Sequence, residues 1–359
     1  MSLPARILGP VDPPRSGSAF DESHLDVRPT DVVLTGDRPT GPLHLGHYTG
    51  SLRTRLAIQG RCPQTILIAD LQALTDNSGQ GARVAANVLD VALDYVAAGI
   101  DPAMNAIAVQ SRLPALAELT MLYLNLVTVA RLERNPTVKA EIELRGFARD
   151  VPAGFLCYPA SQAADITGVR ATLVPVGDDQ LPMLEQSNEI VRRVNRLAGA
   201  EVLPACRPLL TKTPRLPGVD GRKASKSLGN AVPLTASPSE LRALVRAMYT
   251  DRDHVRASDP GRVEGNVVFA YLDAFDPDSE AVAELKAQYQ RGGLGDVALK
   301  QRLESVLETV IAPMRDRRAA AAAHRDDVRE MLVEGTAITR RRTQAVLEDV
   351  RCAFALIDG

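Results

Sequence analysis

Residues Val32 to Ser51, VVLTGDRPTGPLHLGHYTGS, predict a β-strand, a tight turn and a helix in succession. The strand is the β-branched run from Val32 to Thr35, the turn is rich in Gly and Pro, and the helix begins within Leu45 to His47. Backbone N–H groups and the positive end of the helix dipole converge on such a turn, so the unit is suited to binding phosphate. Neither the dinucleotide-binding pattern GxGxxG nor the Walker pattern GxxxxGK[ST] is present in this stretch.

The sequence His44-Leu45-Gly46-His47 within this stretch resembles the HIGH signature of class I aminoacyl-tRNA synthetases. In those enzymes the imidazoles and the glycine hold the phosphates of ATP while an aminoacyl adenylate forms. The resemblance therefore implies that the protein binds ATP and that three residues are catalytic, namely His44, Gly46 and His47. It also implies ATP contacts in the turn before them, at Arg38, Pro39 and Thr40.

A second stretch, Asp220 to Asn230, reads DGRKASKSLGN and predicts a glycine-bounded loop with three cations. Taken alone, such a run is most simply a solvated basic loop. Together with the first motif it resembles the KMSKS loop of the same enzymes, with Ala224 in place of Met. Flexible lysines suit the task of neutralising charge on a leaving pyrophosphate. The resemblance implies that Lys223 and Lys226 are catalytic and that ATP is bound by Lys223, Ala224, Ser225, Lys226 and Ser227.

The composition is that of an ordinary globular protein, because 45% of the 359 residues are apolar and 24% are charged. A chain of this length suggests about two domains. A formal net charge of −2 excludes a uniformly basic nucleic-acid binder but is compatible with a local basic patch. The four dispersed cysteines form no CxxC pattern, so we expect no metal site, no disulfide framework and a reduced cytoplasm. No apolar run reaches the roughly 18 residues of a membrane span, so no membrane contact is expected.

Strand and helix patterns alternate after the first unit. Gln64–Asp70 is a continuous apolar run of strand length, and Ala106–Val109 is a further strand candidate. Apolar residues recur at helical spacing over Arg83–Ala98, which Gly99 ends, and again over about Ala115–Ala130. This alternation predicts an α/β fold with a Rossmann-like, doubly wound parallel sheet.

Two further segments indicate a substrate pocket: Tyr158–Ile166, YPASQAADI, and Ala171–Gln180, ATLVPVGDDQ. The second reads as a strand that runs into a turn, with carboxylates at its carboxyl end, where open α/β sheets bind ligands. The more usual reason for Asp178 and Asp179 at such a place is a turn or an acidic helix start. Together, however, the two segments resemble the pocket of tryptophanyl-tRNA synthetases, a combination that the related tyrosine enzymes do not usually carry.

This resemblance implies that Asp165 accepts the indole N–H of tryptophan. Indole offers one donor, and the ring of phenylalanine would leave the carboxylate unpaired, so the choice is chemically sensible. The resemblance further places Tyr158 and Gln180 on the amino-acid ammonium group. It places the ATP ribose against Gly177, Asp178 and Asp179. The remaining implied tryptophan contacts are Leu34, Gly36, Gln72, Gln162, Val174 and Val176.

Three of these positions depart from residues common in the family near the indole ring: Leu34, Gln72 and Gln162. They predict a larger or more polar pocket, and with the N-terminal tail they make the chain resemble the auxiliary, second type of bacterial tryptophanyl-tRNA synthetase. One more catalytic lysine is implied in residues 131–150, which we expect to be charged and irregular. Lysines there are usually solvated, but Lys139 occupies the place of a family lysine that contacts the ATP phosphates.

After a proline-rich connection, Leu203–Pro217, the pattern becomes purely helical beyond Leu234. We expect four domains or segments. They are a poorly ordered tail over 1–30, with a functional tail as the alternative; a Rossmann-like catalytic domain over 31–235 that includes the KASKS loop; a helical anticodon-binding domain over 236–318; and a C-terminal helix over 319–359 that packs back on the catalytic domain. The runs Arg315–Arg318 and Arg340–Arg342 are candidate phosphate contacts or solvated helix faces.

The expected function is therefore that of a tryptophan–tRNA ligase. The resemblance implies ATP with Mg²⁺, L-tryptophan and tRNA(Trp) as ligands, a homodimer, and a cytoplasmic location. Two alternatives stay open at this point. One is a synthetase paralogue with a regulatory or protein-binding role, and the other is a synthetase that activates tyrosine or a modified tryptophan.

Overall fold

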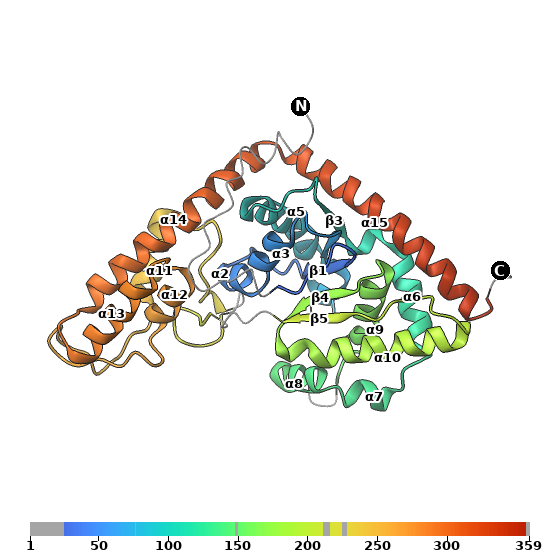
Figure 1. Cartoon of the computed structure of the whole chain (residues 1–359), viewed down its shortest axis with the longest axis horizontal. Helices are drawn as coiled ribbons and strands as arrows, with labels where there is room; N and C mark the ends of the chain where they lie inside the picture. The colour runs from blue at the N-terminus through green and yellow to red at the C-terminus, as the bar shows by residue number, and fades with distance from the viewer. Residues whose placement is uncertain (1–24, 76, 148–149, 211–215, 225–227, 357–359) are drawn as a thin grey trace.

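The computed structural model describes residues 25–75, 77–147, 150–210, 216–224 and 228–356. Its centre is a parallel five-stranded sheet in the order β3-β2-β1-β4-β5 (Figure 1). This confirms the predicted doubly wound, Rossmann-like sheet. The order reverses direction between β1 and β4, and open sheets of this kind bind ligands beyond the carboxyl ends of such strands. The strands are β1 (Val33–Asp37), β2 (Gln64–Ile68), β3 (Asn105–Val109), β4 (Leu173–Val176) and β5 (Arg207–Leu210).

Helices cover the sheet and form the C-terminal part of the chain. The N-terminal half contains α2 (Leu45–His47), α3 (Arg53–Ile58), α4 (Asp70–Ala73), α5 (Gly81–Ala98), α6 (Pro114–Leu124), α7 (Val129–Glu133), α8 (Pro136–Arg145) and α9 (Ala153–Gly168). The other helices are α10 (Leu181–Ala198), α11 (Pro238–Ala247), α12 (Val267–Phe275), α13 (Ser279–Arg291), α14 (Asp296–Ala323) and α15 (Arg325–Ala353). A π-helical turn (Tyr48–Leu52) and short 3₁₀ turns, among them η4 (Gln110–Arg112) and η5 (Asp178–Gln180), complete the elements used below.

Strand β2 is buried on both faces, which explains its continuous apolar sequence. Ile66 and Ile68 belong to a core with α5, α12 and α14, whereas Leu67 belongs to a second core with α6, α9, α10 and α15. Successive side chains of a strand point to opposite faces, so these two cores lie on the two sides of the sheet. The described end of the expected tail, residues 25–30, includes Leu25, which is buried beside Val33. Residues 1–24 lie outside the described residues.

Residues 131–150 are a correction, because most of the described part is helical rather than irregular. Helix α8 has the signals of a short helix: the Asn135 side chain accepts from the Thr137 N–H, Pro136 is the first residue, and Gly146 ends it with φ of 66°. These end signals identify α8, although its apolar pattern is weak. Earlier in the chain, helix α6 ends at Leu124 rather than near Ala130, and a separate short helix, α7, begins at Val129.

Two further elements were not predicted from the sequence. Strand β5 lies inside the expected connection 203–217. Among the described strands it pairs with β4 alone, and an edge strand of this kind tolerates Pro208. Helix α12 is apolar on nearly every side and is buried among other helices, so it lacks the one-sided apolar pattern that identifies a surface helix. By contrast, the start of α11 has a clear local signal, because Ser237 and Glu240 form a capping box and Pro238 is the first helical residue.

The two longest helices, α14 and α15, form the limbs of an inverted V over the sheet (Figure 1). Helix α14 packs against α11 and α12 near its start and against α5 near its end, whereas α15 packs against β3, α6, α9 and α10. The break between the limbs is at His324. The boundary expected at 318/319 therefore lies within α14.

Candidate active site

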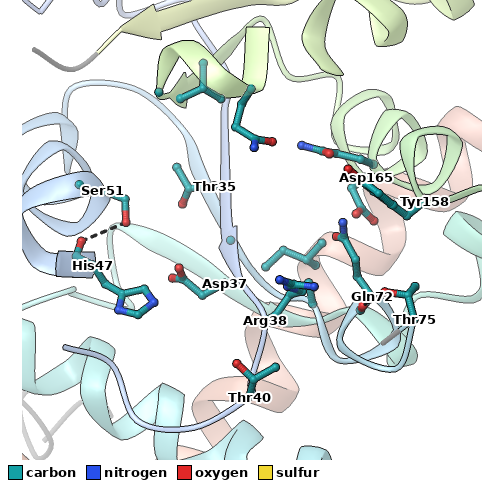
Figure 2. Close-up of a pocket in the computed structure, with 18 of the residues that line it drawn as sticks. Thr35, Asp37, Arg38, Thr40, His47, Ser51, Gln72, Thr75, Tyr158 and Asp165 are labelled. Carbon is teal, nitrogen blue, oxygen red and sulfur yellow. Dashed lines mark hydrogen bonds between the residues drawn. The ribbon is translucent and has the colours of Figure 1, made fainter. Parts of the chain in front are cut away.

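A cavity of about 920 Å³ lies at the carboxyl ends of β1 and β4. Its walls include nine of the predicted tryptophan contacts: Leu34, Gly36, Gln72, Tyr158, Gln162, Asp165, Val174, Val176 and Gln180. They also include predicted ATP contacts and catalytic residues: Arg38, Thr40, His44, His47, Gly177, Lys223 and Ala224. Figure 2 shows His47 and Ser51 on one side of β1, and Tyr158, Asp165 and Gln72 on the other. The cavity thus has a histidine end and an Asp165 end.

Backbone hydrogen bonds join the two signature stretches, which are far apart in sequence. The Leu45 N–H donates to the Val232 carbonyl at 2.9 Å, and the Leu234 N–H donates to the Leu43 carbonyl at 3.1 Å. This ladder places the chain that follows the KASKS loop directly beside the HIGH-type motif. As a result, Lys223 and Ala224 lie on the wall of the same cavity as the histidines.

The two histidines are oriented by the start of α2. The Nδ1 atom of His44 accepts from the Gly46 N–H at 3.1 Å, and the Nδ1 atom of His47 accepts from the His44 N–H at 3.2 Å. A ring nitrogen that accepts a hydrogen bond carries no proton, so each neutral ring has its proton on Nε2. A side chain at Gly46 would place Cβ 2.9 Å from the His44 ring, which explains the glycine. The geometry gives two N–H donors suited to phosphate oxygens.

A buried ion pair forms part of the wall between the two ends. Asp37, the last residue of β1, accepts hydrogen bonds from Arg55 at 2.7 Å and from the Tyr95 hydroxyl at 2.8 Å. Burial alone would raise the pKa of Asp37, but the positive charge of Arg55 and these hydrogen bonds lower it well below its usual value. Asp37 is therefore a carboxylate.

At the other end of the cavity, the Asp165 carboxylate is 4% exposed and has one described hydrogen-bond partner, Gln110. Gln110 Nε2 lies 2.9 Å from both carboxylate oxygens. Burial raises the pKa of Asp165 to about 7, although the hydrogen bond from Gln110 opposes the shift. A buried carboxylate at the wall of a cavity is suited to accept from a ligand donor.

Polar side chains surround Asp165. Gln72 and Gln162 line this end, and the Tyr158 hydroxyl is buried without a hydrogen-bond partner among the described residues. Burial, and after it the negative charge of Glu141, raise the pKa of Tyr158, so its hydroxyl is neutral and can donate or accept. The site is thus more polar than an aliphatic ring pocket, as the departures at Gln72 and Gln162 predict.

Several predicted residues do not line the cavity. Lys139 is exposed on α8, and the cavity is instead lined by Glu141 and Arg145, which are four residues apart and share a helix face. Asp178 and Asp179 are exposed in η5, where they begin the turn before α10, as the simpler interpretation holds. Pro39 and Gly46 also lie outside the lining. Ser225, Lys226 and Ser227 lie outside the described residues.

Sequence reasoning missed the ion pair Asp37–Arg55, the cavity-lining Arg145, and Gln110 behind Asp165. Asp37 follows β1 directly, so the rule that ligands bind at carboxyl strand ends could have identified it. Gln110 likewise follows β3. Arg55 has no local signal, because its role depends on the approach of α3 to β1 in three dimensions.

The basic run Arg315–Arg318 was expected to contact phosphate or to form a solvated helix face. The structure contradicts both expectations for its three arginines. Arg315 binds Glu308 and the Ala236 carbonyl, Arg317 donates to the Ala97 carbonyl, and Arg318 pairs with Asp94 and Asp90. These arginines hold α14 against neighbouring elements, so they are neither solvated nor available to phosphate. No helix in the described part of the chain is long and apolar enough to cross a membrane.

Residues 29–312 match the family model described as tRNA synthetases class I (W and Y). The chain belongs to this class I synthetase family. It is 51% identical to the tryptophan–tRNA ligase of Clostridium longisporum over 326 residues, which are 89% of this chain and 96% of that protein. It is 49% identical to the tryptophan–tRNA ligase of Lactococcus lactis over 333 residues, 90% of this chain and 98% of that protein.

Among solved structures, the chain is similar to the tryptophanyl-tRNA synthetase of Campylobacter jejuni in complex with ADP and tryptophan. The TM-score is 0.78 at 26% identity, over 90% of this chain and 99% of that chain. The fold of this class I synthetase, a parallel sheet followed by a helical C-terminal part, is therefore shared across the whole length compared.

Proposed function

We infer that this synthetase is a tryptophan–tRNA ligase. The Asp165 end of the cavity carries the inference, because a buried carboxylate beside neutral polar groups fits the single indole donor. The relatives at about half identity bear the same activity in their names. In the first step, the tryptophan carboxylate attacks the α-phosphorus of ATP, which gives tryptophanyl adenylate and pyrophosphate. In the second, the terminal ribose hydroxyl of tRNA(Trp) attacks the adenylate carbonyl and releases AMP.

The cavity residues divide this work by position. Asp165 accepts the indole N–H, and Tyr158 and Gln180 hold the ammonium group of tryptophan. The Nε2–H groups of His44 and His47 bind ATP phosphates. No general base is required, because the attacking carboxylate is already ionised, so catalysis consists of positioning and charge neutralisation.

Cations at the histidine end favour the leaving pyrophosphate. Lys223 lies on the cavity wall, and Lys226 joins it in this proposal. Arg145 on α8 occupies the place in the wall that the resemblance gives to Lys139. Mg²⁺ would enter bound to the ATP phosphates. No group of three or more His, Cys, Asp or Glu side chains in the described part of the chain could hold it independently.

The helices within residues 236–318 form the proposed anticodon-binding domain. Arg341 and Arg342 on α15 are exposed and are the better candidates for RNA phosphate, since most of the Arg315–Arg318 run binds protein atoms. We also propose a cytoplasmic homodimer, as the family resemblance implies. Light scattering after gel filtration tests the dimer.

The test of the activity is ATP–pyrophosphate exchange with tryptophan, tyrosine, phenylalanine and ring-substituted tryptophans. We expect exchange with tryptophan and none with tyrosine. In Asp165→Ala, kcat/KM for tryptophan should fall by about 10³-fold, because the selecting acceptor is gone. Exchange driven by tyrosine would show that the protein is a tyrosine-activating synthetase instead. Absence of exchange with every amino acid, by a protein that binds ATP, would instead favour a regulatory paralogue.

A further inference from the structure

Gln110 is buried at 2% exposure behind the cavity and does not line it. Its amide contacts two elements in a defined orientation. Nε2 donates to both oxygens of Asp165 at 2.9 Å, and Oε1 accepts from the backbone N–H of Gln72 at 3.1 Å. Reversing the amide would oppose an oxygen to the carboxylate and a donor to a donor. The network therefore fixes which side of Gln110 faces Asp165.

The hydrogen bonds from Gln110 decide from which direction the Asp165 carboxylate can accept a hydrogen bond from a ligand. Each carboxylate oxygen has two acceptor sites, and Gln110 occupies one on each. The remaining sites face away from Gln110, and Asp165 lies on the cavity wall. Without Gln110, the carboxylate would have no hydrogen-bond donor among the described residues and would be free to rotate. A ligand donor would then have to order it at an entropic cost.

Gln110 is itself held by the chain on both of its sides. It begins η4 directly after β3. The Ser111 N–H that follows it donates to Asp70 at 2.8 Å. The Val109 N–H that precedes it donates to the Thr336 hydroxyl of α15 at 3.1 Å. A residue on the C-terminal helix thus completes the edge of the sheet next to Gln110.

A second contact from α15 fixes the end of η4. The guanidinium of Arg340 donates two hydrogen bonds to the Arg112 carbonyl, at 3.0 and 2.6 Å. One turn earlier, Gly335 lies so near β3 that a Cβ there would be 2.2 Å from the Ile107 carbonyl oxygen. This close approach is possible only for glycine. Helix α15 therefore packs closely against the end of β3 that leads into Gln110.

We propose that Gln110 is a positioning residue of the tryptophan site, which holds the Asp165 carboxylate toward the indole N–H, and that α15 holds Gln110 in place through Arg340. This inference rests on the proposed function. It extends the amino-acid site from the cavity wall to the C-terminal helix α15, although no residue of α15 is part of the described cavity lining. Changes on α15 then alter tryptophan affinity without contact with tryptophan.

The decisive variant is Gln110→Met, which keeps the volume and removes both hydrogen-bonding groups. The chain contains no Trp residue, so the fluorescence of added tryptophan reports binding without a background from protein indole. We expect the Kd for tryptophan to rise about tenfold, as for loss of an ordered hydrogen bond to a charged acceptor. The KM for ATP should stay unchanged, because the histidine end is untouched.

A tryptophan analogue with a benzothiophene ring distinguishes positioning from general damage, because sulfur replaces the N–H that Asp165 accepts. Pyrophosphate exchange with both amino acids gives their kcat/KM ratio. In Gln110→Met this ratio should fall toward one, since only tryptophan loses its acceptor. An equal loss for both amino acids, or an unchanged ratio, overturns the proposal. Absence of tryptophan exchange in the wild-type enzyme would overturn the proposed function first.

The contact from α15 has a matched control on the same helix. Arg340→Ala should raise the Kd for tryptophan about threefold, whereas Arg325→Ala, an exposed arginine at the start of α15, should leave it unchanged. These surface variants also serve if Gln110→Met fails to fold. Equal Kd values for Arg340→Ala, Arg325→Ala and the wild type would exclude α15 from the tryptophan site.

Discussion

At the Asp165 end of the cavity a buried carboxylate is held by a buried amide, whereas at the histidine end the two histidines are half-buried and the cation Lys223 is exposed. Asp165 is 4% exposed and is bonded to Gln110, which is fixed by a backbone N–H. Lys223, by contrast, is exposed and reaches the cavity from a stretch far along the sequence. Figure 2 shows β1 between the two ends.

This difference matches the task that we propose for each end, indole binding at Asp165 and phosphate binding at the histidines. The indole of tryptophan does not change during the reaction, so a rigid acceptor gives selectivity at no cost in catalysis. The phosphates of ATP gain charge and separate, so cations on long side chains that can follow them are useful. Substitutions at the two ends should therefore affect different kinetic constants.

The largest effect that tests this comparison is expected from Lys223→Ala. Loss of one cation that meets the leaving pyrophosphate should lower kcat by about 10²-fold. The Kd for tryptophan, read from its own fluorescence, should stay within twofold of the wild type. Single-turnover adenylate formation gives the rate directly. A large change in tryptophan affinity would show that the two ends are coupled rather than separate.

The two ends also differ in how far the sequence alone predicts them. The strand-turn-helix motif predicts a ligand-binding turn at His44 and His47, and both line the cavity, because the local sequence sets both the turn and the helix start. Lys139 was expected there and is exposed instead. The rotation of α8 decides which of its residues faces the cavity, and packing sets that rotation.

Gln110 and Arg55 illustrate what no local pattern could reveal. Gln110 reaches Asp165 only because α9 packs behind the carboxyl end of β3, and Arg55 reaches Asp37 across 18 residues of sequence. A glutamine or an arginine has no periodic or motif signal for such a contact. The resemblance supplied residues that line the cavity, but the residues that support them emerge only from the three-dimensional packing.

A pH titration should change the affinity for tryptophan at the Asp165 end by about tenfold per pH unit. Burial raises the pKa of Asp165 to about 7, so below that pH the free enzyme carries a neutral carboxyl. The ionised form is the better acceptor, so affinity for tryptophan should fall as pH drops from 8 to 5. Tyr158, whose pKa burial also raises, stays neutral throughout, and the charged side chains that act on it are Glu141 and Arg38.

The tryptophan Kd measured by fluorescence at each pH gives the midpoint. In Asp165→Asn the dependence should disappear between pH 5 and 8, because an amide does not titrate. A dependence of equal size in that variant would assign the titration to another group.

The smallest effect compares two cations of α8. Arg145 lines the cavity, and Lys139 is exposed outside it, so Arg145→Ala should raise the KM for ATP about fivefold and Lys139→Ala less than twofold. Helical geometry gives the reason, because position 145 shares the cavity-facing side with 141 whereas 139 lies two residues away. Each variant is the control for the other. The opposite order would mean that α8 turns or shifts when ATP binds, and the histidine end would then be adaptable in its backbone as well as in its side chains.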